Sequence, residues 1–291
     1  MPFVPKRVVR RVARRYVAGE TLEQALGVVG ELNSGGCSAT LDVLGEFIER
    51  EAQADATRDD YIAALQGINS RGLNCNVSVK LTAFGLLLDE VRTLERVRAV
   101  VQAAAQHKNF VRIDMEDSKC TTPTIAVFRT LRQEGHDNVG LVLQAYLKRT
   151  QADIDALTDL HPSFRLCKGI YVEPEAIAFK GLEPVRENYR RCLERMFAGS
   201  AVRVAIATHD AQLVEDALGI LRSKAVPRER YEFQMLLGVT EHLRARLVRE
   251  GHPVRVYVPF GHDWYGYCTR RLKENPKIAT HVTKALFGFG R

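Results

Sequence analysis

Eight short apolar segments recur along the chain, and each interval between them can hold a helix. They are rich in β-branched residues, and they span 38–43, 75–80, 110–115, 139–145, 164–170, 203–207, 231–236 and 254–258. Two of the intervals, 89–106 and 210–223, carry apolar residues at clear helical spacing. Strands that alternate with helices form a parallel sheet, and eight such units favour a closed (βα)8 barrel. A doubly wound open sheet is the main alternative, but it usually has fewer strands, and no GxGxxG motif follows the first strand.

The first 36 residues have helical character and end in an Asn-Ser-Gly-Gly break at 33–36. Within them, segment 6–17 alternates basic pairs with apolar pairs, which predicts an amphipathic basic helix. Two interpretations of this helix stay open: it packs its apolar stripe on the domain, or it lies on an anionic membrane surface. No repeat or linker interrupts the chain, so we expect one catalytic domain over 1–291, with an N-terminal helical segment followed by a barrel over 37–291.

Composition narrows the class of protein. The chain is 46% hydrophobic and 26% charged, as globular proteins usually are. Its net charge of +7 is concentrated at the N-terminus without a basic-aromatic pattern, so we expect no nucleic-acid partner. It has no run of 18 apolar residues and no signal-peptide pattern, so we expect a cytoplasmic protein, with the inner face of the membrane as the alternative for the basic helix. Six scattered cysteines without zinc-type spacing predict reduced thiols and no metal site.

Polar and charged residues interrupt several predicted strands, although strands of a parallel barrel should be apolar on both faces. They share one parity of each strand, as Arg112, Asp114 and Glu116 do. A buried charge is costly unless it is paired, so we expect Arg112 to pair with a neighbouring carboxylate near the barrel floor. Several of these residues lie at or near strand C-termini, where the sites of such barrels are found. They are Lys80, Asp114, Gln144, Lys168 and Tyr257. Their convergence predicts a polar site at the barrel mouth.

Two adjacent arginines follow the last predicted strand. Arg270 and Arg271 lie about 100° apart on a predicted helix, so two guanidinium groups can converge on one carboxylate or phosphate. The alternative is a solvated helix face with an ion pair to Glu274. The other charged residues expected at the mouth are Lys80, Asp114, Arg165, Lys168 and Glu46. Cations outnumber carboxylates in this set, which indicates anionic ligands, including a second group such as a cofactor pyrophosphate.

Nine short motifs span most of the chain. They are LDVLGE (41–46), SVKLTAFG (78–85), RIDMED (112–117), LQAYLKR (143–149), RLCKGIYVEPE (165–175), ATHD (207–210), YEFQMLLG (231–238), VYVPFG (256–261) and YCTRRLKENP (267–276). In this order and spacing they resemble the flavin-dependent proline dehydrogenases. The resemblance implies a distorted, TIM-like (βα)8 barrel in which the helix after strand eight covers the mouth, with FAD bound without a Rossmann fold. The chain has no room for the aldehyde dehydrogenase and DNA-binding regions of the bifunctional proline utilization A enzymes, so it looks like a monofunctional member.

The resemblance also implies roles for individual residues. The matching substrate-site positions are Lys80, Arg270 and Arg271 around the proline carboxylate, Leu236 and Tyr257 against the ring, the active-site Tyr171, Asp114 in support of the cations, and Glu46 as a gate that pairs with Arg270. The positions that match or adjoin flavin contacts are Gln144, Arg165, Cys167, Lys168, Gly169, Thr208 and His209. The implied reaction is oxidation of L-proline to Δ1-pyrroline-5-carboxylate, the first step of proline catabolism to glutamate, by hydride transfer from C5 to N5 of FAD. Implied partners are a quinone acceptor and a downstream pyrroline-5-carboxylate dehydrogenase.

Two other functions remain open from the residues alone. A Schiff-base aldolase on a phosphate-binding barrel would use Lys168 or Lys80 as its nucleophile. A nucleic-acid binder would use the basic N-terminus and would show a steep salt dependence. Neither explains the polar residues at the strand ends, so proline oxidation is the function that we predict.

Overall fold

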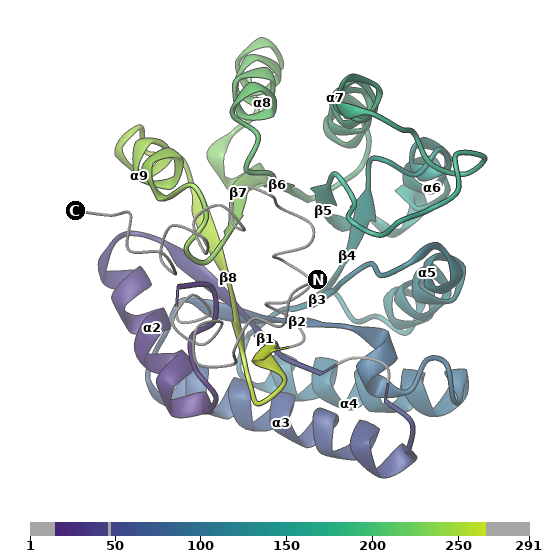
Figure 1. Cartoon of the computed structure of the whole chain (residues 1–291), viewed down its shortest axis with the longest axis vertical. Coiled ribbons are helices and arrows are strands. Elements are labelled where there is room, and N and C mark those ends of the chain that lie inside the picture. Colours follow the sequence, from purple (N-terminus) through teal and green to yellow (C-terminus); the bar gives the residue numbers. More distant parts are fainter. Residues whose placement is uncertain (1–14, 46–47, 266–291) are drawn as a thin grey trace, which may run out of the picture.

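The computed structural model describes residues 15–45 and 48–265, and within them eight parallel strands close into a barrel in the order β1 to β8 (Figure 1). The strands are β1 Ser38–Val43, β2 Cys75–Val79, β3 Val111–Ile113, β4 Val139–Gln144, β5 Ser163–Cys167, β6 Arg203–Ala207, β7 Tyr231–Leu236 and β8 Val254–Phe260. The helices are α2 Leu22–Ser34, α3 Glu51–Ser70, α4 Glu90–Gln106, α5 Ser118–Gln133, α6 Thr150–Ala156, α7 Leu182–Ala198, α8 Ala211–Ser223 and α9 Glu241–Arg249, with short 3-10 helices at η1 Leu81–Phe84, η2 Thr158–Leu160 and η3 Arg228–Arg230. Pairing of β8 with β1 closes the barrel.

This order of elements confirms the predicted (βα)8 fold. Each strand overlaps a predicted segment, and the two helices predicted from apolar spacing are α4 and α8. The Asp210 side chain caps α8 by accepting a hydrogen bond from the backbone N–H of Gln212 at the start of the helix. Helix α2 ends at Ser34, where the Asn-Ser-Gly-Gly break predicts an end. The helix expected after β8 and residues 6–14 of the basic segment lie outside the described residues.

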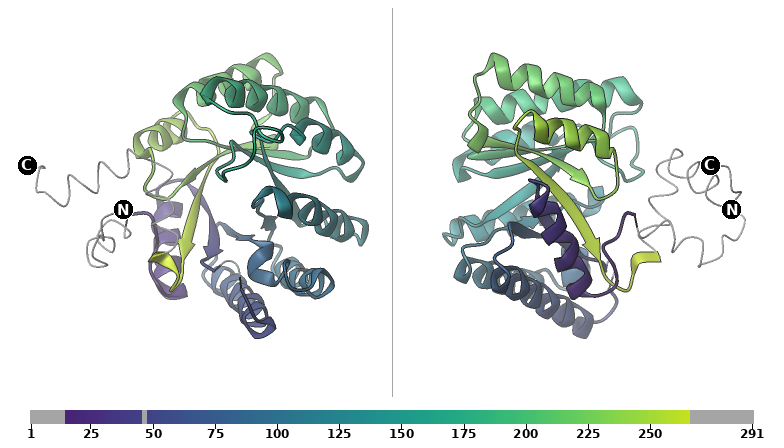
Figure 2. Two further views of the ribbon diagram at one scale, coloured as in Figure 1. Left: turned by 45° about the vertical axis from the view of Figure 1, so that its right-hand side comes forward. Right: turned by 90° about the vertical axis from the view of Figure 1, so that its left-hand side faces the viewer.

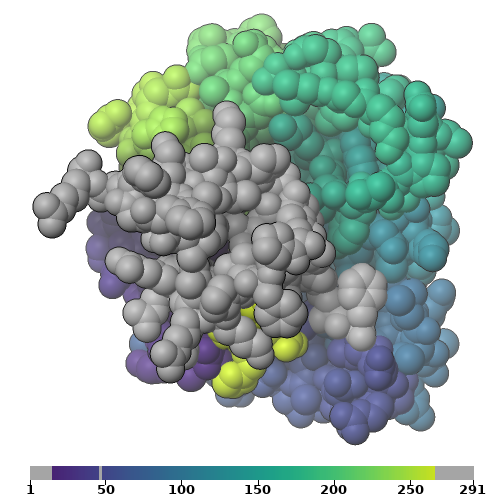
Figure 3. Space-filling view, viewed as in Figure 1, coloured from purple at the N-terminus to yellow at the C-terminus, as the bar shows by residue number. Residues whose placement is uncertain are grey.

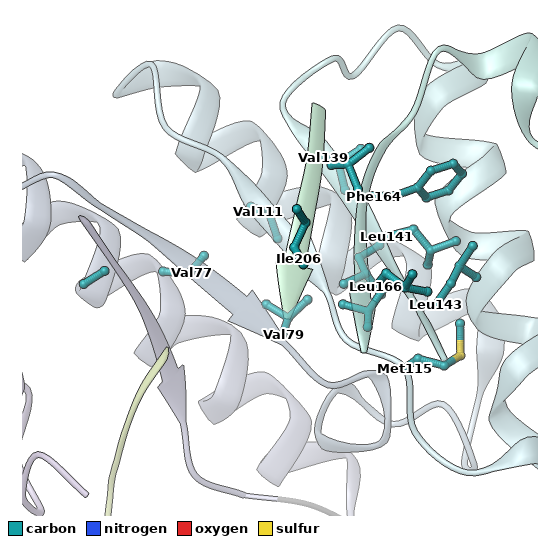
Figure 4. Packing of buried hydrophobic residues seen from close by; sticks show 14 of the residues in the cluster. Val77, Val79, Val111, Met115, Val139, Leu141, Leu143, Phe164, Leu166 and Ile206 are labelled. Atoms are coloured by element: carbon teal, nitrogen blue, oxygen red, sulfur yellow. The ribbon is translucent and has the colours of Figure 1, made fainter. Parts of the chain in front are cut away.

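The apolar core lies between the strands and the helices, because the outward-facing strand residues are apolar. Val77, Val111, Leu141 and Ile206 are each 0% exposed. Figure 4 shows these side chains on their strands among other buried apolar residues. The helices follow one another around the barrel in chain order and cover this layer (Figures 1 and 2). The colours of the space-filling view run in the same order around the rim of the molecule (Figure 3). Burial of one such side chain stabilises the fold by about 1.5–3 kcal/mol.

Most inward-facing residues are polar, which confirms the parity predicted from the strands, although Val142 and Ala205, the register partners of Arg165, are apolar. Arg165 on β5 donates to the Ser78 hydroxyl of β2 at 2.9 Å, and these two strands are separated by β3 and β4. Such a contact is made only across the barrel interior. The Thr40 and Ser78 hydroxyls, both fully buried, lie 3.3 Å apart beside it. The interior of this barrel is therefore held by hydrogen bonds, and its apolar packing is on the outside of the sheet.

Candidate active site

Five side chains meet inside the barrel near the C-terminal strand ends and form what we call the mouth cluster: Asp42, Lys80, Asp114, Arg165 and Tyr257. Lys80 Nζ donates to the two Asp42 oxygens at 2.6 and 2.7 Å, and to the Tyr257 hydroxyl at 3.2 Å. Tyr257 donates to Asp114 Oδ2 at 2.8 Å. Arg165 donates to Asp114 Oδ1 at 2.6 Å. Residues from β1, β2, β3, β5 and β8 are thus joined in one hydrogen-bonded chain.

The mouth cluster is buried, yet its charges are compensated. Asp42 is 0% exposed, and Asp114 and Arg165 are also buried. Each carboxylate contacts a cation, which offsets the desolvation of both groups. Burial, followed by the nearby Asp114 charge, raises the pKa of Tyr257 well above its usual value. The Tyr257 hydroxyl therefore stays protonated and remains a donor to Asp114.

Asp42 is a member of this cluster that its sequence context does not single out. It lies in LDVLGE, a segment in which Glu46 is the carboxylate that the family resemblance brings forward. The available signal was parity, because Asp42 shares the inward face of its strand with Thr40. Tyr61 of α3 supports the same place: its hydroxyl donates to the backbone carbonyl of Ser78 at 2.6 Å and accepts from the backbone N–H of Val43 at 3.1 Å. These bonds tie the ends of β1 and β2 together.

A second charged group lies where β5 and β6 end. Lys168 Nζ is 3.3 Å from Asp210 Oδ2. Arg186 of α7 donates to both Asp210 oxygens, at 2.9 and 2.7 Å. Burial raises the pKa of Asp210, but the Arg186 hydrogen bond and the Lys168 charge together lower it to about 2, so the carboxylate stays ionised. Arg186 lies on an amphipathic helix, and no sequence signal marks it as part of this group.

The orientation of His209 is determined by the end of β7. The backbone N–H of Leu236 donates to His209 Nε2 at 2.8 Å. Nε2 is therefore the acceptor nitrogen, and the ring proton is on Nδ1. Thr208, in the same turn, accepts at its hydroxyl from the backbone N–H of Asp210 at 3.1 Å. The structure thus brings together Thr208, His209 and Leu236, which come from two strand ends.

Gln144 and Cys167 are register partners at the ends of β4 and β5. The Gln144 amide nitrogen donates to the backbone carbonyls of Met115 and Glu116, each at 3.2 Å. Its Oε1 atom is buried and has no hydrogen-bond partner among the described residues. An acceptor left in this state is costly, so it indicates a ligand that donates to it.

Gly169 follows β5 with φ +104, and a Cβ there would lie 2.0 Å from Tyr146 Cδ1. Only glycine fits at this position, both sterically and by its left-handed backbone. Tyr171 lies two residues further in the same loop and is partly exposed. The loop therefore passes close to the barrel mouth at Gly169.

Arg112 corrects one prediction, because it contacts none of the carboxylates among the described residues directly. Its guanidinium donates to the Ser163 carbonyl at 2.6 Å and to the Ser163 hydroxyl at 3.0 Å. Burial, followed by repulsion from Arg165, lowers its pKa well below the usual value. The carboxylate that the structure places near the floor is Glu232, and it pairs with Arg255 and Arg203, both at 2.9 Å. We call these the floor cluster: Arg112, Ser163, Arg203, Glu232 and Arg255.

The predicted surplus of cations at the mouth is also altered. Lys80, Arg165 and Lys168 each contact a carboxylate, and Asp42 and Asp210 are the two that the prediction did not count. Arg186, which the prediction also did not count, adds a cation beside Asp210, so the described cations of these two groups outnumber their carboxylates even without Arg270 and Arg271. These two arginines and Glu46 lie outside the described residues.

Two kinds of feature are absent from the described ranges. Between residues 15 and 265, leaving out 46–47, no helix is long and apolar enough to cross a membrane. The same residues contain no group of three or more His, Cys, Asp or Glu side chains placed to hold a metal ion.

A closed (βα)8 barrel with a charged, hydrogen-bonded mouth at the C-terminal ends of its strands defines a TIM-like barrel enzyme. The family model for proline dehydrogenase matches residues 25–284. The proline dehydrogenase of Deinococcus radiodurans is 37% identical over 280 residues, which cover 94% of this chain and 90% of that protein. Proline dehydrogenase 2 of Bacillus subtilis is 37% identical over 277 residues, which cover 95% and 91%. The chain belongs to the proline dehydrogenase family.

A solved structure is similar over the same barrel. Proline utilization A from Bdellovibrio bacteriovorus, inactivated by N-propargylglycine, superposes with a TM-score of 0.86 at 25% identity. The match covers 93% of this chain and 33% of that chain, so this chain spans one part of that larger protein. These comparisons give no support to the aldolase alternative.

Proposed function

We propose that this chain, as one catalytic domain over 1–291, oxidises L-proline to Δ1-pyrroline-5-carboxylate with FAD and passes the electrons to a quinone. As a member of the proline dehydrogenase family it is an oxidoreductase that acts on a CH–NH donor in the first step of proline catabolism. The observation that carries the proposal is the mouth cluster, in which a lysine, an arginine and a tyrosine hydroxyl converge on two carboxylates at the end of the barrel where substrates bind.

The substrate site is proposed around Lys80. Its ammonium can give the proline carboxylate a charge-assisted hydrogen bond, and its contacts with Asp42 and Tyr257 restrict where that bond can form. Tyr257 and Leu236 would face the ring, Tyr171 would complete this side, and Asp114 would hold Tyr257 and Arg165. Arg270 and Arg271 would complete the carboxylate clamp, with Glu46 as a gate.

The described residues fit FAD on three observations. Gln144 Oε1 is a buried acceptor that lacks a partner among the described residues, and the flavin ring carries an N–H donor. Gly169 leaves no room for a Cβ and lets the backbone approach closely. Arg165 and Lys168 supply positive charge, which suits a pyrophosphate or a reduced flavin. Cys167, Thr208 and His209 would border the same cofactor.

When bound, FAD accepts the hydride that leaves C5 of proline. The side chains of this chain bind and orient the substrate, and holding the reacting atoms close together lowers the barrier by proximity. Asp42 and Asp114 are engaged by Lys80 and Arg165, so they anchor cations. Lys80 and Lys168 are ion-paired ammonium groups, whereas a Schiff-base nucleophile is a neutral amine.

The visible spectrum of the purified protein, recorded before and after anaerobic addition of proline, tests the proposal. A flavin band that bleaches on addition of proline supports both cofactor and substrate. A flavin band that ignores proline contradicts the substrate. A colourless protein that FAD cannot reconstitute contradicts the cofactor, and borohydride trapping with a carbonyl substrate would then test the aldolase.

Replacement of Arg271 by Met tests the clamp. Loss of a charge-assisted carboxylate contact costs about 2–5 kcal/mol, so the KM for proline should rise by orders of magnitude. An unchanged KM would remove Arg271 from the clamp.

We also propose a cytoplasmic protein that contacts the inner face of the membrane through residues 6–17, where its quinone would be found. A further proposed partner is a pyrroline-5-carboxylate dehydrogenase, and no nucleic acid is expected. Sedimentation with anionic liposomes, for the whole chain and for a variant without residues 1–17, tests the contact. Absence of liposome binding by the whole chain would contradict it.

A further inference from the structure

The loop that joins β5 to α7, residues 168–181, carries three of the residues proposed to lie at the active site. They are Lys168, Gly169 and Tyr171. Its tip exposes apolar side chains, with Val172 98% and Ile170 38% exposed. A loop of this length without a helix or strand is mobile unless it is held by tertiary contacts, and such loops usually carry function.

Both ends of this loop are held by the neighbouring β4–α6 loop. At its start, the backbone N–H of Tyr146 donates to the Lys168 carbonyl at 2.7 Å. Towards its end, the N–H of Lys148 donates to the Ile177 carbonyl at 2.9 Å, and the N–H of Phe179 donates to the Tyr146 carbonyl at 2.7 Å. These backbone bonds position the ends and leave the tip to be held by something else.

Glu173 supplies the contact next to the tip. Its Oε1 accepts from the backbone N–H of Ser118 at 2.7 Å, and its Oε2 accepts from the Ser118 hydroxyl at 2.6 Å. Ser118 is the first residue of α5, so the carboxylate lies where the helix dipole favours a negative charge. Glu173 is 7% exposed, so its carboxylate is almost fully withdrawn from solvent.

Helix α5 does not need Glu173 as its cap. Asp117 is already its N-cap, and its side chain accepts from the backbone N–H of Cys120. Glu173 accepts from the Ser118 N–H, which Asp117 does not satisfy, and its two bonds fasten the loop to the first turn of α5. Lys180, near the end of the loop, also donates to the Glu173 backbone carbonyl, which joins the two sides of the loop.

We propose that Glu173 is a positioning residue that holds the tip of the β5–α7 loop at the barrel mouth and so determines how tightly the cofactor binds. This inference rests on the proposed function, because it takes Lys168, Gly169 and Tyr171 to border FAD. Without the carboxylate, the segment between the fixed ends is free to move away from the mouth. The cofactor must then order the loop as it binds, and its affinity falls.

The test is the dissociation constant of FAD for the apoprotein, measured by flavin fluorescence in four variants. Glu173→Ala removes both bonds and should raise the constant about 10–100-fold. Ser118→Ala removes one bond and should have a smaller effect. Glu173→Gln can keep both, since the serine hydroxyl can reverse its direction, and should stay within about threefold of wild type. Glu175→Ala, two residues along and exposed, is the matched control and should not differ from wild type.

Limited chymotrypsin digestion and proline kinetics separate positioning from general destabilisation. Cleavage after Tyr171, which lies between the fixed ends of the loop, should accelerate in Glu173→Ala while cleavage elsewhere keeps its rate. With saturating FAD, the KM for proline should change less than the FAD constant does. If Glu173→Ala does not fold, the FAD dissociation constants of Ser118→Ala and Glu173→Gln can still be compared with that of wild type.

The outcomes also separate this inference from the proposed function. Wild-type protein that binds no FAD contradicts the proposed function. Wild-type protein that binds FAD and is reduced by proline, while Glu173→Ala and Ser118→Ala bind FAD as tightly as Glu175→Ala does, overturns the role of Glu173 and leaves the function intact.

Discussion

The two charged clusters inside the barrel differ in the acceptors that hold their cations. In the floor cluster, Arg112 donates to the backbone carbonyl of Ser163, and Arg255 donates to the backbone carbonyl of Ala39, each at 2.6 Å. Backbone carbonyls are held in place by the strand ladder. Arg112 and Arg255 are therefore tied to the sheet itself, and a ligand cannot take over these backbone bonds. Arg203 and Arg255 also pair with the Glu232 side chain, which is buried at the floor.

In the mouth cluster the cations donate to side chains instead. Lys80 donates to Asp42 and Tyr257, and Arg165 donates to Asp114. A side-chain acceptor can give up a donor when a carboxylate of similar strength arrives, so this cluster can exchange an internal bond for one to a substrate. Burial of charge in the same barrel thus serves stability at the floor and binding at the mouth.

The largest expected effect is the loss of stability when Glu232 at the floor is replaced by Gln. The amide nitrogen of the glutamine would face Arg203 or Arg255. Breaking a buried ion pair lowers the free energy of unfolding by about 3–5 kcal/mol. Urea unfolding should show this loss, while the KM for proline of the folded fraction should stay within about twofold. A large rise in the KM of Glu232→Gln for proline would contradict the claim that the floor serves stability and not binding.

Whereas Glu232→Gln should mainly lower stability, Asp114→Asn at the mouth should mainly impair the reaction with proline. It weakens the acceptor for Arg165 and Tyr257, and loss of such charged contacts costs about 2–5 kcal/mol of transition-state stabilisation. The ratio kcat/KM for proline should fall accordingly. The comparison predicts that a proline analogue with a carboxylate raises the melting temperature of Glu232→Gln more than that of Asp114→Asn. Equal shifts would argue against it.

Two glycines offer a smaller, matched test at about 1–3 kcal/mol. A Cβ at Gly140 would lie 2.4 Å from Arg112 Nη1 and 2.6 Å from the Ser163 carbonyl oxygen, whereas one at Gly169 would meet the Tyr146 ring. Gly140→Ala should lower the free energy of unfolding and leave FAD affinity unchanged. Gly169→Ala should lower FAD affinity. Urea unfolding and FAD titration of both variants check this. A loss of FAD affinity in Gly140→Ala would contradict the assignment of stability to the floor and of binding to the mouth.

The smallest change in any single step is the pH dependence of the floor, because it is spread over several pH units. Burial raises the pKa of Glu232, but Arg255 and Arg203 lower it from 4.5 to about 2. Because the folded pKa is depressed, the stabilisation is complete above pH 4.5 and is lost as the pH falls towards 2. The stability difference between wild type and Glu232→Gln should narrow over this window, by at most about 1.4 kcal/mol per pH unit. A difference that is constant from pH 5 to about pH 2 would contradict the pairing.

Much of the fold could be predicted, because the signals that carry it are local. Alternating strand and helix patterns locate all eight strands within the described residues, and the parity of Arg112 and Asp114 within β3 predicts which side chains face inwards. The positions of Lys80 and Tyr257 near strand ends likewise follow from the strand boundaries. Periodicity of two or of 3.6 residues is a property of the chain itself.

The pairings within the barrel could not be predicted in this way. Parity places Asp42 inside, but only the closed sheet brings it to Lys80, 38 residues later in the chain. The same holds for Arg112, which contacts Ser163, 51 residues away, instead of a carboxylate. Glu173 is one of several acidic residues in its sequence context until the structure places it against α5.

The sequence by itself therefore determined that this chain is a (βα)8 barrel of the proline dehydrogenase family with a polar interior. The tertiary structure decided which buried charge contacts which, and hence which cluster is tied to the backbone and which can exchange its partners. The reason is geometric: contacts across a barrel depend on how the strands are staggered when the sheet closes, and no short-range pattern in the sequence records that stagger.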